Sequence, residues 1–197
     1  LSEGGEQKKM SKRRGDFVTA QELVERIGPD ATRFWMIERS QDQQLEIDLE
    51  KAASQSDANP VYYVQYAHAR LCSIRRKVED AGLAPMDGTV TTDSLAIDSL
   101  HASEKRLIKR LGELPLVIAE AAVRRQPHRM HHFAYDVASD VAKFYRDCRV
   151  TGDGIDPAVT ARRLLTCDAA RSVLALTLGL VGVSAPERME QRAEPVA

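Results

Sequence analysis

Two lysines near the start of the chain stand three residues apart in the segment Lys9-Met10-Ser11-Lys12. Glycines flank this basic segment at Gly4-Gly5 and at Gly15, which favours a mobile loop. Such a loop can bring two ammonium groups onto a polyphosphate. Positive charge beside a leaving group stabilises the transition state more than the ground state. Losing one such donor typically raises the activation free energy by about 3–4 kcal/mol. The spacing therefore predicts that the two lysines bind a polyphosphate. For these four residues taken alone, a solvated basic segment is the alternative interpretation.

A second set of candidate residues combines tyrosine and arginine at helical spacing. Tyr63, Tyr66 and Arg70 stand at i, i+3 and i+7, away from the apolar stripe of their segment. Tyr145 and Arg149 form an i, i+4 pair. Unpaired bases are bound by stacking on aromatic rings, worth about 1–3 kcal/mol per base, and by hydrogen bonds to their edges. These residues predict a surface for unpaired nucleotides, although Tyr145 equally fits an apolar stripe, where a buried tyrosine is the alternative.

Histidine and cysteine side chains raise the question of a metal site. His68 and Cys72 stand at i, i+4, and His131-His132 precede Cys148 on one predicted helix. The sequence has no Cys-x-x-Cys pair or other compact ligand cluster, so we expect no bound metal and interpret the cysteines as core residues. His68 is expected to be a packed residue rather than a catalyst. Three cysteines cannot pair completely, which favours a reducing, cytoplasmic location.

The first fifty residues predict a small mixed α/β module. Thr19 to Glu22 fits a capping box, for a short helix that stops at Gly28. Pro29-Asp30 can start a second helix. Apolar and acidic residues alternate from Leu45 to Glu50, which is typical of a half-buried strand.

The remainder predicts long amphipathic helices. Asn59-Pro60 is a good helix start, Asp156-Pro157 caps the last helix, and Gly182 ends it. A polar stretch from Pro85 to about Asp98 indicates a loop or short hairpin. Pro115 predicts a bend in the helix that follows this stretch. Apolar stripes at helical spacing mark the helices, in residues 61–78, 107–122, 130–148 and 161–180. The predicted fold class is therefore mainly α, with a small α/β module at 1–56, an all-α helical bundle at 57–189 and a flexible tail at 190–197.

Composition narrows the possible function classes. The chain has 197 residues, of which 43% are hydrophobic and 29% charged, enough to exclude a disordered chain. Its net charge of −1 argues against binding nucleic acid by bulk electrostatics, but basic residues cluster locally. These clusters lie in 8–14, 70–77 and 105–110. The longest charge-free stretch, Ser172 to Pro186, is shorter than the ~20 residues of a bilayer span, so we expect no membrane partner.

The segment from Lys9 to Thr19 resembles the signature loop of class I aminoacyl-tRNA synthetases, and in particular of the arginyl enzymes. The resemblance continues in further motifs, which are Asp30-Ala31-Thr32-Arg33-Phe34, Leu45-Glu46-Ile47-Asp48, Asn59 to Arg70, Pro127-His128-Arg129, Phe144-Tyr145, Cys148-Arg149-Val150 and Gly182 to Met189. Because these motifs keep their order over most of 189 residues, we identify the chain as similar to bacterial arginyl-tRNA synthetases.

The resemblance implies an enzyme that joins arginine to tRNA(Arg) with ATP, through an arginyl-adenylate, with Mg²⁺ accompanying the nucleotide. The family's Rossmann domain, with its His-x-Gly-His motif and arginine pocket, should precede Leu1. These 197 residues would then be a C-terminal fragment that comprises the signature loop, the stem-contact module and the all-α anticodon-binding domain, called DALR. We expect the fragment alone not to activate arginine. Its expected partners are tRNA(Arg), and ATP and L-arginine through the catalytic domain, but not DNA, and we expect a monomer.

Residue roles are carried over from the family by position. Lys9, Met10, Ser11 and Lys12 would bind ATP, with Lys12 closest to the departing pyrophosphate. Arg13 stands where many class I loops carry serine. The residues that would approach the anticodon are Tyr63, Tyr66, Arg70, Tyr145, Arg149 and Met189. Met189 is usually terminal in the family, whereas Glu190 to Ala197 follow it here.

Two other functions fit parts of the sequence. A free-standing tRNA- or RNA-binding helical module without catalysis would need the bundle, but it would have no reason to retain Lys9 and Lys12. A helical adaptor could use the basic clusters to bind an acidic protein. Selective binding of an arginine anticodon would be expected of the synthetase and of the RNA-binding module, but not of the adaptor.

Overall fold

The structure is a computed structural model that describes residues 2–3, 6–7, 18–80, 95–152 and 154–189. Helices dominate the described residues, which confirms the mainly α class. The strands assigned among them are β1 (Ser2–Glu3) and β2 (Glu6–Gln7), which pair antiparallel. The predicted ATP-binding loop from Lys9 to Lys12 lies outside the described residues, as do the tail at 190–197 and most of the predicted loop after Pro85.

Three short helices form the N-terminal module, α1 (Ala20–Ile27), α2 (Pro29–Met36) and α3 (Leu49–Ala53). The capping box is confirmed, because the Glu22 amide donates to the Thr19 hydroxyl (3.1 Å) and the Glu22 carboxylate accepts from the Thr19 amide (2.7 Å). Gly28 separates α1 from α2 with a φ of +82°, a conformation that L side chains rarely adopt. This turn sets the direction of α2 toward the bundle.

The predicted strand from Leu45 to Glu50 is wrong. Ile47 and Leu49 are buried and Glu46 is exposed, so the alternation of the sequence does reflect one-sided burial. However, the Asp48 carboxylate accepts hydrogen bonds from the amides of Glu50 (3.1 Å) and Lys51 (3.2 Å). This N-cap turns the chain into α3, because it satisfies donors that a strand would have paired with a neighbour.

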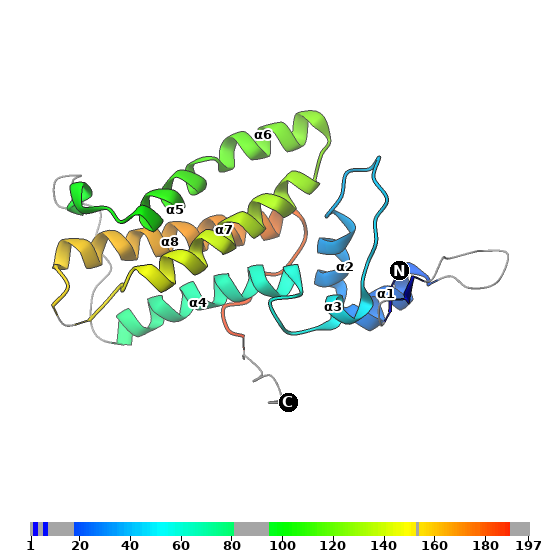
Figure 1. Ribbon diagram of the computed structural model, residues 1–197, viewed down its shortest axis with the longest axis horizontal. Coiled ribbons are helices and arrows are strands. Elements are labelled where there is room, and N and C mark those ends of the chain that lie inside the picture. The colour runs from blue at the N-terminus through cyan, green and yellow to red at the C-terminus, as the bar shows by residue number, and fades with distance from the viewer. Residues whose placement is uncertain (1, 4–5, 8–17, 81–94, 153, 190–197) are drawn as a thin grey trace.

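Five longer helices form the bundle, which are α4 (Pro60–Asp80), α5 (Ala102–Gly112), α6 (Leu114–Arg124), α7 (His128–Asp147) and α8 (Pro157–Leu180). A short 3-10 helix, η2 (Ile97–Ser99), precedes α5. Helix α7 lies between the others and contacts α4, α5, α6 and α8, while α4 also packs along α8 (Figure 1). The N-terminal module adjoins the start of α4 (Figure 1).

The apolar stripes predict most of the observed core. Phe133, Val137 and Phe144 on α7 are buried, as are Leu174 and Leu178 on α8. The stripe at 107–122 is not one bent helix, because α5 ends at Gly112 and α6 begins at Leu114.

A charged pair lies inside the bundle between α5 and α8. Glu104 has no exposed surface and Arg162 is 4% exposed. The Arg162 guanidinium donates to both carboxylate oxygens of Glu104, at 3.0 and 3.2 Å, and to the Leu95 carbonyl at 2.9 Å. Burial by itself would raise the pKa of Glu104, but the hydrogen bonds from Arg162, from the His101 backbone and from Arg163 outweigh it, and the pKa is lowered.

Candidate nucleic-acid interface

A surface hollow of about 260 Å³ lies between α4, α7 and the C-terminal segment. Its lining residues are Tyr66, Ala69, Arg70, Ser73, Arg76, Tyr145, Arg188 and Met189, and we call it the tyrosine hollow. Four of the six residues predicted to approach the anticodon therefore line one site. Three arginines and no acidic residue line the hollow, which suits an anionic or electron-rich ligand.

Arg70 lies between the two tyrosine rings of the hollow. Its guanidinium carbon is 4.8 Å from the Tyr66 ring centroid and 4.5 Å from the Tyr145 ring centroid. It also donates to the Tyr66 hydroxyl at 3.2 Å. Among the described residues, no salt bridge involves Arg70. Cation–π contacts thus orient the guanidinium without neutralising its charge.

The exposure of Tyr145 decides between its two sequence interpretations. Its side chain is 45% exposed, although its neighbour Phe144 is fully buried. The alternative of a core tyrosine is therefore wrong. On α4, Val64, Ala67 and Leu71 face the core, so that Tyr66 and Arg70 emerge on the partly exposed side of the same helix.

The C-terminal segment, residues 182–189, reaches the hollow along α4, and we call it the strap. Three side chains of α4 donate hydrogen bonds to its backbone carbonyls. Gln65 binds Ser184 (3.0 Å), His68 binds Pro186 (3.0 Å) and Arg76 binds Glu187 (3.1 Å). His68 is buried, which confirms that it is a packed residue.

A second hollow, of about 390 Å³, adjoins the first. It is lined by Ile74, Lys77, Tyr145, Arg146, Cys148, Arg149, Val150 and Thr151, so the two hollows share Tyr145. Arg149 is exposed and lies in this second hollow instead of beside Arg70. The Cα of Gly152 faces the Arg149 guanidinium so closely that a side chain at position 152 would displace Arg149.

Tyr63 does not line either hollow. Its ring packs against the ring of Tyr135 on α7, with centroids 5.1 Å apart, and it contacts the core. Burial raises the pKa of its hydroxyl, with a smaller contribution from Tyr135.

The predicted site did not include four residues of the tyrosine hollow, Ala69, Ser73, Arg76 and Arg188, although Arg76 belongs to the basic cluster at 70–77. Ser73 stands seven residues after Tyr66, so the helical period could have found it. Arg188 had no periodic signal, because its position depends on the path of the strap.

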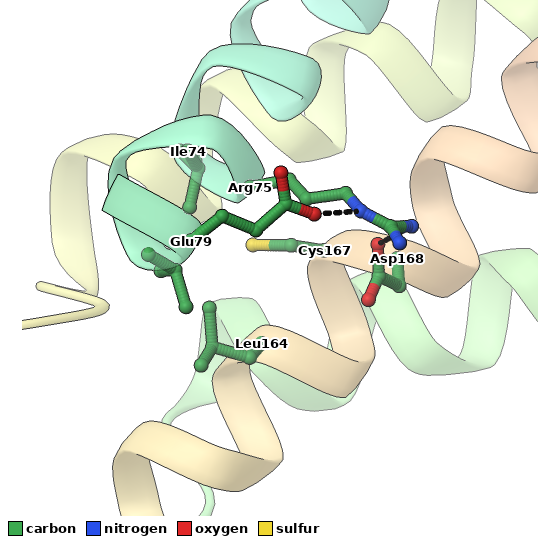
Figure 2. Close-up of a pocket in the computed structure, with 7 residues that line it drawn as sticks. Ile74, Arg75, Glu79, Leu164, Cys167 and Asp168 are labelled. Atoms are coloured by element: carbon green, nitrogen blue, oxygen red, sulfur yellow. Dashed lines mark hydrogen bonds and ion pairs between the residues drawn. The ribbon is translucent and has the colours of Figure 1, made fainter. Parts of the chain in front are cut away.

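A small cavity between α4 and α8 is a poor ligand site. Figure 2 shows Arg75 bridging Glu79 and Asp168 beside it, with hydrogen bonds of 2.9 and 3.3 Å. Its volume of about 20 Å³ holds roughly one water molecule. Burial raises the pKa of Cys167, which lines it, to about 12, so the thiol stays protonated at neutral pH.

Among the described residues, no three His, Cys, Asp or Glu side chains are grouped as metal ligands would be. No helix in the described ranges combines the length and apolarity that a bilayer span requires.

Comparison with known proteins decides the family. Residues 64–189 match the family described as DALR anticodon binding domain. The chain belongs to this DALR family. The matched residues contain all eight residues of the tyrosine hollow and end at Met189.

The chain that carries this DALR domain is also similar to whole enzymes. It is 44% identical over 190 residues to the arginine–tRNA ligase of Heliobacterium modesticaldum and 46% identical over 189 residues to that of Moorella thermoacetica. Each match covers 96% of this chain and 33% of the relative, so the chain spans about a third of their length. A solved structure from Campylobacter jejuni, assigned as an arginyl-tRNA synthetase, is also similar, with a TM-score of 0.76 and 25% sequence identity. The match covers 95% of this chain and 38% of the Campylobacter jejuni chain.

Proposed function

We propose that the chain is the C-terminal part of an arginine–tRNA ligase, whose DALR domain binds the anticodon loop of tRNA(Arg). The observation that carries this proposal is the tyrosine hollow, where two partly exposed rings flank a guanidinium that no carboxylate neutralises among the described residues. Anticodon bases are unpaired and can turn out of their stack, and rings with a guanidinium bind such bases without requiring a duplex.

Each predicted anticodon residue receives a role in this proposal. Tyr66 and Tyr145 stack with bases, Arg70 binds a base edge or a phosphate, and Met189 closes the hollow by apolar contact. Arg149 binds the backbone of the adjoining nucleotide from the second hollow. Tyr63 contributes less, by supporting the surface beside Tyr66.

For the whole enzyme we propose ATP-dependent formation of arginyl-tRNA, with Mg²⁺ entering with the nucleotide. Lys9 and Lys12, in the loop with Met10 and Ser11, would stabilise the negative charge that develops on pyrophosphate. Residues 1–56 would supply this loop and the stem-contact module, and 57–189 the anticodon-binding domain. The 197 residues by themselves should show no arginine-dependent exchange between ATP and pyrophosphate, even with tRNA present. Exchange by the purified chain would contradict this division.

The binding proposal is tested with a fluorescently labelled anticodon stem-loop of tRNA(Arg). Fluorescence anisotropy should show tighter binding than to the same stem-loop with an unrelated anticodon. Tyr66→Ala and Tyr145→Ala should each weaken binding about tenfold, since stacking on one ring is worth about 1–3 kcal/mol. Tyr145→Phe is the matched control, because it retains the ring and should retain most of the affinity. Equal binding of both stem-loops and of unrelated polyanions would favour the adaptor instead.

A further inference from the structure

Asp30, at the start of α2, is bonded to the strap although the two are far apart in the sequence. One of its carboxylate oxygens accepts the backbone amide of Ser184 at 3.2 Å. The other accepts the Gln65 side-chain amide at 2.8 Å and the Ser184 hydroxyl. Gln65 is 8% exposed and also donates to the Ser184 carbonyl. Asp30, Gln65 and Ser184 thus form a cluster that joins α2, α4 and the strap, and we call it the clasp.

A second contact from α2 supports the clasp. Arg33, one turn after Asp30, donates to the Gly182 carbonyl at 3.0 Å. Gly182 has a φ of +71°, and its Cα faces the Arg33 side chain. The strap is therefore bonded to the N-terminal module at the point where it leaves the bundle.

The position of the strap determines one side of the tyrosine hollow. Arg188 and Met189 belong to the strap, whereas the facing residues Tyr66 and Tyr145 belong to α4 and α7. No helix or strand is assigned to residues 183–189, so regular backbone pairing does not fix this segment. Val183 packs in the core, and beyond it the place of the strap depends on side-chain hydrogen bonds. Those that Asp30 accepts are charge-assisted and hence the stronger type.

We propose that Asp30, acting through Gln65 and Ser184, is a positioning residue for anticodon binding. Its side-chain hydrogen bonds among the described residues go to Gln65 and Ser184, which do not line the hollow, but it fixes the strap so that Met189 and Arg188 face the two tyrosines. RNA affinity then depends on the N-terminal module as well as on the bundle. This inference rests on the proposed function, because it concerns the same RNA site.

The first experiment needs no RNA. Hydrogen exchange is measured by mass spectrometry on strap amides of the 197-residue chain, comparing the unsubstituted protein with Asp30→Ala. We expect exchange in the peptide that contains Ser184 to rise about tenfold, because loss of the clasp allows local opening. Asp30→Asn should give a smaller rise, since it retains an acceptor for the Ser184 amide but sets an NH₂ group against that of Gln65.

Asp48→Ala is the matched control for this experiment. It removes the N-cap of α3 in the same module and touches no strap residue. Its strap exchange should equal that of the unsubstituted chain, while exchange in α3 rises. Unchanged strap exchange in both Asp30 variants, or an equal rise in Asp48→Ala, would overturn the clasp.

The second experiment separates positioning from a general structural effect. Dissociation constants for the anticodon stem-loop are measured for Asp30→Ala, for Arg188→Ala combined with Met189→Ala, and for all three substitutions together. Asp30→Ala should weaken binding about fivefold when Arg188 and Met189 are present and less than about twofold when both are replaced, because its effect passes through the strap. Additive losses would overturn the proposal. If the unsubstituted chain binds no stem-loop, the proposed function fails, while the exchange experiment still decides the clasp.

Discussion

Arg162 and Arg70 lie in the same bundle, but their surroundings differ. Arg162, between α5 and α8, uses its guanidinium on the two oxygens of Glu104 and on a backbone carbonyl. Arg70, on α4, contacts two tyrosine rings and a hydroxyl, and no salt bridge among the described residues involves it. The first guanidinium is buried and paired with a carboxylate, whereas the second is partly exposed and has no carboxylate partner among the described residues. The difference lies in where the structure places a carboxylate.

The largest expected effect is on the buried pair. Glu104→Ala leaves the Arg162 guanidinium buried and unpaired, which should lower the free energy of unfolding by about 3–5 kcal/mol. Urea denaturation followed by circular dichroism measures this loss. Glu79→Ala is the control, because it removes an exposed partner of Arg75 and should cost less than about 1 kcal/mol. If the two losses are alike, burial does not distinguish these ion pairs.

His131 extends the comparison to a buried group with no partner. It is 5% exposed, its ring lies 4.2 Å from that of Phe34, and neither ring nitrogen has a hydrogen-bond partner among the described residues. Burial, with a smaller contribution from His132, lowers its pKa to about 4, below the ordinary value near 6.5. Between these values the unfolded chain binds more protons than the folded one, so acid favours unfolding.

The expected loss from His131 is therefore up to about 3 kcal/mol as the pH falls from 7 to 4. Urea titrations at several pH values measure this slope. His131→Phe removes the titrating group from the same space and should flatten the profile between pH 6.5 and 4. His132→Phe is the control, and an identical profile for both variants would show that His131 is not the group responsible.

On the exposed side, Arg70→Ala should weaken binding of the anticodon stem-loop by about tenfold to a hundredfold, equivalent to about 1.4–2.7 kcal/mol. The free energy of unfolding should change by less than about 1 kcal/mol, because no buried partner loses its charge compensation. Arg124→Ala, on the exposed end of α6, is the matched control and should leave affinity within about twofold. A stability loss as large as that of Glu104→Ala would remove the distinction between the two arginines.

The smallest effect separates Tyr63 from Tyr66 on α4. Tyr63→Ala should weaken RNA binding less than about threefold, because its ring already packs on Tyr135 and does not line the hollow. Tyr66→Ala should have the larger effect on affinity in the same anisotropy titration. A greater loss for Tyr63 would move the binding surface from the hollow toward the Tyr63–Tyr135 pair.

Much of the fold could be predicted because helical periodicity and capping are local properties. The capping box at Thr19 and the Asp156 cap of α8 follow from side chains that reach their own backbone. The strand at Leu45 was predicted wrongly, since alternation reports one-sided burial and does not report whether a neighbouring strand exists. Pro115 predicted a bend in the apolar stripe, whereas the structure has two helices that meet at Glu113.

The candidate site was only partly predictable for a similar reason. Spacing along α4 placed Tyr66 and Arg70 together, and residue type indicated stacking. Spacing could not show that Tyr63 packs on Tyr135, or that Arg149 lies in a separate hollow, because both depend on how α7 and its following loop lie against α4.

The sequence by itself determined the helical class, most of the core stripes, the family resemblance and a face of α4 that combines rings with a guanidinium. These depend on residue type and on separations within one or two helical turns. Only the tertiary structure decided which arginine meets a carboxylate, that Tyr145 is exposed, and that Asp30 binds the strap that carries Met189. Such contacts join residues as many as 154 positions apart, and they exist only once the helices have packed.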